Sequence, residues 1–89
     1  MLHDAVPNPF NPSTLVSFEL GAASHVRLRV FDVAGRLVRT LIDEQMPGGV
    51  SQVEWNGRDD AGRSVASGVY HYQMQATGYV ETKRAVLVK

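Results

Sequence analysis

Cysteine is absent from this 89-residue chain. Its absence excludes a disulfide scaffold, a thiolate zinc site and a cysteine nucleophile. Long apolar runs are also missing: none exceeds five residues, whereas a membrane-spanning helix needs about 20. The sequence therefore predicts no membrane insertion.

Neither sign of charge is in excess. Nine Lys and Arg balance nine Asp and Glu, giving a formal net charge of zero. A balanced chain has no electrostatic footprint for nucleic acid or for an anionic membrane. The apolar fraction of 44% and the charged fraction of 20% are ordinary globular values and argue against wholesale disorder. The length predicts a single domain, residues 1–89, with one modest core.

The first residues are rich in proline. Pro7, Pro9 and Pro12 exclude a helix, because proline lacks the amide donor and restricts the residue before it. We expect an extended segment with a short edge strand around residues 4–6. Residues 1–7 also lack the basic start and apolar stretch of a signal peptide. If the domain is exported, we expect its signal to lie upstream in a longer parent chain.

Alternation of apolar and polar residues dominates the rest of the chain. It is clearest in residues 25–31, where Val26, Leu28 and Val30 share one face and predict a half-buried strand. Phe31 breaks the pattern and indicates a bulge or twist. Residues 37–42 also fit a helical stripe, but a helix this short is marginal, so we favour a strand. The remaining expected strands are 14–20, 51–55, one opening at Gly68 and 79–88.

Six strands and an N-terminal edge strand, with turns about every ten residues, define the expected fold class. It is all-β: an immunoglobulin-like (fibronectin type III-like) antiparallel β-sandwich of about seven strands. A small barrel is the alternative. Parallel βαβ units are excluded because no segment is long enough for a crossover helix.

The polar loop at residues 56–63 is the one candidate cation site. Asp59 and Asp60 could offer oxygen ligands to calcium. Their spacing does not match the EF-hand series and arginines flank them, so we favour turn chemistry, in which the acids cap backbone amides. We predict no cofactor.

The sequence offers no catalytic constellation. The three histidines lack metal-ligand spacing, and no serine lies in a Gly-x-Ser-x-Gly elbow. Gly-Arg pairs lack the lysine of a phosphate loop. We therefore predict that the domain is not an enzyme and has no catalytic residues.

Aromatic and basic side chains are candidates for binding surfaces. Trp55, Tyr70 and Tyr72 could form a sugar-binding platform, but each lies on the apolar side of its strand, so we favour the core. Tyr70 could make a tyrosine-corner hydrogen bond. His25, Arg27 and Arg29 form a basic stripe, which we interpret as a solvated strand face that discourages edge pairing.

Together these motifs resemble a known family. The chain resembles the immunoglobulin-like domain of the flagellar hook-capping protein and, more closely, the type A C-terminal sorting domains of bacterial type IX secretion. The blocks that carry the resemblance run from Pro7 to Thr14, from Val30 to Arg36, from Trp55 to Arg63, from Ala66 to Tyr70 and from Val86 to Lys89. Within them the positions that match the motif are Pro9, Phe10, Asn11, Pro12, Trp55, Gly57, Asp59, Gly62, Gly68 and Tyr70.

The resemblance implies a function. Such domains lie at the C-terminus of larger exported proteins, and the outer-membrane export machinery recognises them as an address. We expect this machinery as the partner, a cargo domain upstream, and a secreted or cell-surface location after passage through the periplasm. The alternative is a structural or interaction module, resembling a hook-cap assembly domain or an accessory domain of an extracellular hydrolase. The expected recognition residues form the C-terminal strand, which β-addition could read: Ala85, Val86, Leu87, Val88 and Lys89.

Overall fold

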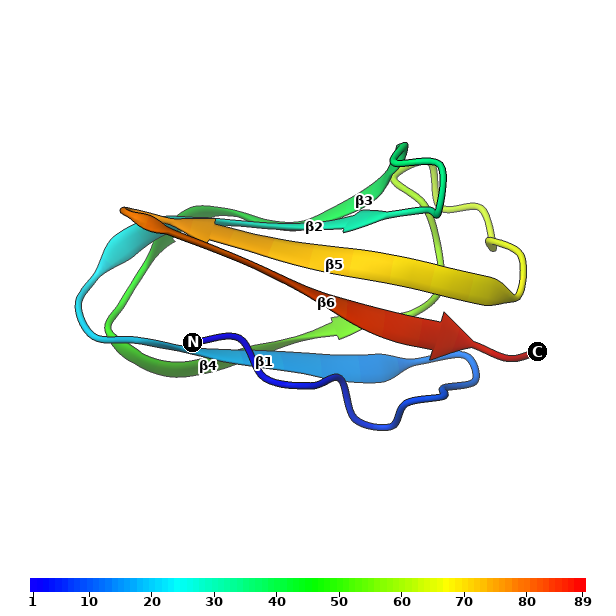
Figure 1. The fold of residues 1–89 in the computed structure, drawn as a ribbon, viewed down its shortest axis with the longest axis horizontal. Helices are drawn as coiled ribbons and strands as arrows, with labels where there is room; N and C mark the ends of the chain where they lie inside the picture. The colour runs from blue at the N-terminus through cyan, green and yellow to red at the C-terminus, as the bar shows by residue number, and fades with distance from the viewer.

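Six antiparallel strands in two facing sheets make up the protein. The computed structural model describes residues 1–89, and Figure 1 shows the two layers, with the chain termini marked. The structure contains no helix that could cross a membrane. The strands are β1 (Thr14–Leu20), β2 (Ser24–Phe31), β3 (Leu37–Met46), β4 (Gly49–Trp55), β5 (Gly68–Ala76) and β6 (Tyr79–Leu87).

The strand order gives the sandwich its two sheets. β1 pairs with β4 in one sheet, and the other has the order β3-β2-β5-β6. Every pairing between these strands is antiparallel. This arrangement confirms the predicted all-β, immunoglobulin-like sandwich. It also confirms residues 37–42 as a strand, which pairs with β2 at an edge of the larger sheet.

The expected seventh strand is present only as a bridged segment. Leu2 bridges Phe18 and Val6 bridges Leu15, both antiparallel. The main chain of residues 1–6 thus covers the outer edge of β1, with His3 N–H donating to the Ser17 carbonyl at 3.0 Å. Two bridges separated by unpaired residues do not form a continuous strand.

The core consists of the side chains that alternation predicted to point inward. In β2, Val26, Leu28 and Val30 are at most 1% exposed. Tyr72 and Met74 of β5 lie in the same cluster of 15 buried apolar residues. Burial raises the pKa of Tyr72 to about 12, and its hydroxyl donates to the His3 carbonyl at 2.8 Å.

β3 is irregular along its pairing with β2. The register shifts between Leu28 and Arg29 and again between Val30 and Phe31. The second shift confirms the irregularity that Phe31 indicated. Bulges increase the local twist of an edge strand and so discourage pairing with a further strand.

Candidate recognition site at the joined chain ends

The C-terminal residues proposed for recognition are divided between core and surface. Ala85 and Leu87 are each 1% exposed and belong to the core, whereas Val88 is 49% exposed. Val86 is partly buried and Lys89 is exposed. The core therefore covers Ala85 and Leu87 but leaves the Val88 side chain accessible.

A segment from the other end of the chain lies along this strand. Phe10 N–H donates to the Val86 carbonyl, and Val88 N–H donates to the Phe10 carbonyl, both at 2.9 Å. The Asn8 side chain completes the contact: its Nδ2 donates to the Arg84 carbonyl at 3.0 Å, and its Oδ1 accepts from Val86 N–H at 2.9 Å. The outer edge of β6 is therefore occupied from Arg84 to Val88. We call this contact the terminal clamp.

Lys89 continues the clamp beyond the last strand. Its backbone N–H donates to Ser67 Oγ at 3.0 Å, and its ammonium group donates to Ser64 Oγ at 2.8 Å. Both serines lie in the connection between β4 and β5, so the final residue is anchored on that loop.

The proline-rich motif presents one side chain to the core. Phe10 is 2% exposed, whereas Pro9, Asn11 and Pro12 are exposed. The two prolines restrict the backbone and so fix the path of the chain on both sides of Phe10. The motif therefore positions the Phe10 ring in the core.

The Phe10 ring lies in an aromatic cluster with Trp55 and Tyr70. Phe10 and Trp55 have ring centroids 5.3 Å apart, and Trp55 and Tyr70 pack edge to face at 5.2 Å. Trp55 is 2% exposed, and its indole N–H donates to the Arg58 carbonyl at 3.0 Å. The sugar-platform interpretation is therefore wrong, and the core interpretation of these aromatics is confirmed.

Tyr70 makes the tyrosine-corner bond that the sequence suggested. Its hydroxyl donates to the Ala66 carbonyl at 2.6 Å, four residues upstream, just before β5 opens at Gly68. Burial raises the pKa of this hydroxyl above its ordinary value of 10.0, which keeps its proton in place for the bond. The bond fixes the entry of the chain into β5.

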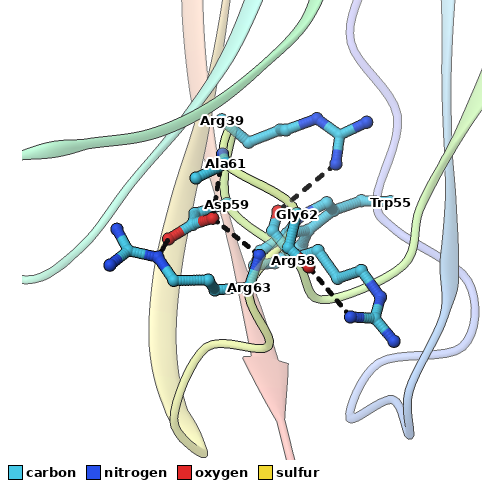
Figure 2. A network of polar contacts seen from close by, with 7 residues as sticks. All are labelled: Arg39, Trp55, Arg58, Asp59, Ala61, Gly62 and Arg63. Carbon is cyan, nitrogen blue, oxygen red and sulfur yellow. Dashed lines mark hydrogen bonds and ion pairs between the residues drawn. The ribbon is translucent and has the colours of Figure 1, made fainter.

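In the acidic loop, the Asp59 carboxylate accepts hydrogen bonds from the backbone of the loop itself (Figure 2). Asp59 Oδ1 accepts from the amides of Ala61 and Arg63 at 3.0 and 2.9 Å, and Oδ2 accepts from Arg63 Nε at 3.2 Å. These donors, the Arg63 amide above all, lower the pKa of Asp59. Asp60 turns away and accepts from Thr40 N–H at 3.0 Å. The two carboxylates splay apart, and the turn interpretation is confirmed for Asp59.

The same turn occurs a second time, which the sequence reasoning missed. Asp32 Oδ1 accepts from the amides of Ala34 and Arg36 at 2.9 and 3.0 Å, and Oδ2 accepts from Arg36 Nε at 2.9 Å. Gly35, like Gly62 in the first turn, has φ near +80° (83° and 82°). The signal was available in the sequence: Asp-x-Ala-Gly-Arg starts at residue 32 and again at residue 59.

The remaining candidate side chains form no reactive cluster. His3 pairs with Glu19 at 3.0 Å and His25 with Asp43 at 2.6 Å, on different sheets. No group of three or more His, Cys, Asp or Glu residues is placed to hold a metal ion. The largest hollow, about 400 Å³, lies at the opposite end of the sandwich, between residues 19–24 and 76–79.

The basic stripe of β2 lies on a central strand and not on an edge strand, as its interpretation required. β2 lies between β3 and β5, so its polar face protects no edge. Arg29 is moreover partly buried rather than fully solvated. The interpretation as an edge-protecting stripe is wrong, because strand order depends on contacts between distant parts of the chain.

Fold and site together define a small immunoglobulin-like module whose sequence motifs serve packing, turns and the joining of the chain ends. The chain belongs to the FlgD Ig-like domain family, whose model matches residues 5–79. No individually curated protein resembles it at the level of sequence.

Solved structures share the fold. The chain is similar to part of PorZ, described as an essential bacterial surface component of the type-IX secretion system of Porphyromonas gingivalis, with 23% identity, a TM-score of 0.69, and coverage of 99% of this chain and 11% of that one. Dimeric latent PorU of the same organism has 20% identity and a TM-score of 0.79, with coverage of 98% of this chain and 9% of PorU. FlgD of Pseudomonas aeruginosa has 24% identity and a TM-score of 0.66, with coverage of 84% of this chain and 59% of FlgD. The chain thus spans only a small part of the first two proteins and just over half of the third.

Proposed function

We propose that this domain is a non-catalytic sorting and surface-attachment module of an exported bacterial protein, read by the outer-membrane machinery of type IX secretion. The observation that carries the proposal is the similarity of almost the whole chain to small parts of PorZ and PorU. A module of this size within much larger chains is consistent with a sorting domain attached to a cargo domain. Secretion or display on the cell surface would follow.

The terminal clamp limits how the export machinery could recognise the C-terminal strand. Reading by β-addition needs free main-chain groups, but those of Val86 and Val88 on the outer edge are engaged by Asn8 and Phe10. Recognition would then use either the exposed side chains of Val88 and Lys89 or an edge released from the clamp. The two routes differ in how they respond to loss of Asn8.

A secretion assay tests the proposal. Residues 1–89 are fused to the C-terminus of a reporter with its own signal peptide, in a bacterium with type IX export. Deleting residues 85–89 would remove Ala85 and Leu87 from the core, so we use point variants. We expect Val88→Asp with Lys89→Ala to reduce export. Val80→Asp, at an exposed valine of β6 (60% exposed), should leave export unchanged.

Circular dichroism first confirms that each fusion is folded. A folded wild-type reporter retained in the periplasm would overturn the proposal. Equal export of both variants would exclude reading through the side chains of Val88 and Lys89 and leave the released edge as the route. Asn8→Ala then separates the two routes. It should increase export if the released edge is read, and leave it unchanged if the exposed side chains are read.

A structural or assembly role is the second candidate, favoured by the family model and by the similarity to FlgD. It predicts that the domain associates with other subunits of a surface structure without being an export signal. Export of the fused reporter would speak against it, and co-purification of the domain with a surface assembly would support it.

A further inference from the structure

The outer face of the larger sheet gathers cationic side chains. Register places Arg29 beside Gln73 and Thr82, and Phe31 beside His71 and Arg84. Arg27 lies one row away, opposite Asp43, which is the one carboxylate that strand alternation places on this face. We call this surface the arginine face and define it by Arg27, Arg29, Phe31, His71, Gln73, Gln75, Thr82 and Arg84.

Arg29 is held in place at the centre of the arginine face. Its guanidinium lies 5.2 Å from the centroid of the Phe31 ring, and its Nη2 donates to Gln75 Oε1 at 3.1 Å. Its Nε is buried and has no hydrogen-bond partner. An unused buried donor costs free energy. A side chain that is already fixed also loses little entropy when a partner binds.

The surroundings of Arg29 suit a directional polar contact. Gln73 and Gln75 are partly buried, and Thr82 and Arg84 are exposed, so amide and hydroxyl groups lie beside the guanidinium. A shallow hollow of about 200 Å³ adjoins them, lined by His25, Arg27, Gln75 and Ala76. Arginine binds carboxylates through paired N–H donors, and neighbouring amides can bond to peptide groups.

The smaller sheet has no basic side chain on its strands. Alternation directs Glu19 of β1 and Glu54 of β4 outward, and no Lys or Arg lies in either strand. Glu19 is already paired with His3 at 3.0 Å, and the N-terminal ammonium group donates to its carbonyl. The arginines and lysines that lie in strands all belong to the larger sheet.

We propose that the arginine face binds an acidic segment of a partner protein, with Arg29 and Arg84 contacting its carboxylates. Fixed arginine beside partly buried glutamine favours a polypeptide, because the glutamine amides can bond to peptide groups while the guanidinium bonds to a carboxylate. The proposal does not depend on the sorting role, since it concerns side chains on the outer face of the larger sheet. Arg84 takes part in the terminal clamp only through its backbone carbonyl.

Amide chemical shifts of the ¹⁵N-labelled domain test the proposal during titration with a peptide of alternating Glu and Ser. A peptide of alternating Gln and Ser is the uncharged control. We expect shifts in β2, β5 and β6 with the acidic peptide alone. Arg84→Gln should weaken binding about tenfold, which corresponds to the loss of one charge-assisted contact.

Lys83→Gln is the matched control for Arg84→Gln. Lys83 precedes Arg84 on the same strand but faces the other way, 3.2 Å from Asp4. Its loss removes the same charge and should leave the affinity unchanged. Arg29→Lys keeps the charge but removes the guanidinium fork, and should weaken binding about fivefold or more.

Three results would overturn the proposal. Equal weakening by Lys83→Gln and Arg84→Gln would indicate a nonspecific charge effect. An absence of shifts on the arginine face would exclude the site. Binding to phosphatidylglycerol vesicles without binding to the acidic peptide would identify a membrane surface instead.

Discussion

The ring of Phe10 packs against the indole of Trp55, with centroids 5.3 Å apart and planes tilted by 54°. The contact joins the proline-rich motif near the start of the chain to the Trp-Asn-Gly motif at the end of β4. Two sequence blocks that suggested a family thus serve one physical purpose: they close one end of the core.

Replacing Trp55 with alanine should destabilise the fold strongly. The indole is 2% exposed, so its loss leaves a cavity, and we expect a decrease of about 3–5 kcal/mol in the free energy of unfolding. Denaturant titration by circular dichroism measures it. Val50→Ala, at a side chain 71% exposed, should change stability by less than about 0.5 kcal/mol. A loss below about 1 kcal/mol for Trp55→Ala would contradict the buried placement.

Two glycines provide a test of close packing against the proline-rich motif. Gly57 (φ +70°) and Gly62 (φ +82°) both have left-handed backbones, but a Cβ at Gly57 would lie 3.1 Å from the Pro12 carbonyl oxygen, whereas Gly62 faces open space. Gly62→Ala should cost about 1–2 kcal/mol through its backbone alone. Gly57→Ala should cost at least about 1 kcal/mol more, because Pro12 must move.

Thermal and denaturant unfolding of the two alanine variants compares them directly. Equal decreases in the free energy of unfolding would show that the segment around Pro12 moves at no cost and does not pack against the loop.

The paired Asp-x-Ala-Gly-Arg turns predict a loss of stability in acid. Backbone amides of Arg36 and Arg63 lower the pKa of Asp32 and of Asp59 below the ordinary value of 3.8. A carboxylate with a lowered folded pKa contributes stability that is fully present above its unfolded pKa and lost as pH falls through the folded pKa. The free energy of unfolding should therefore fall as the pH drops below about 4.

Urea titrations at about pH 6 and about pH 3 measure this acid loss. The double variant Asp32→Asn with Asp59→Asn should lose less stability between these two conditions than the wild type. Asp43 and Glu81 also have lowered pKa values, so part of the decline should remain. An identical decline in both proteins would show that the two turns do not contribute.

The strands and the core were predictable because alternation is local. Val26, Leu28 and Val30 share a face in any strand, whatever lies beside it, and the structure buries all three. The tyrosine corner was predictable for a similar reason: Tyr70 and Ala66 are four residues apart, so the bond depends on one turn.

Strand order and edge protection were not predictable. Whether β2 is central depends on its pairing with β5, more than forty residues away, and the alternation in β2 is compatible with either position. The terminal clamp is equally nonlocal, since it joins Asn8 to Arg84 and Val86. The repeated turn is different, because its five-residue pattern is local and is visible in the sequence at residues 32 and 59.

The terminal clamp also sets when the domain can fold during synthesis. Phe10 and Asn8 emerge early, yet their hydrogen-bond partners lie between Arg84 and Val88. Contacts between the two ends of a chain are the last to become possible on a ribosome, which releases the chain from its N-terminus. Residues synthesised ahead of this domain would already be free to fold, so completion of the sandwich would report that this domain itself has been made in full.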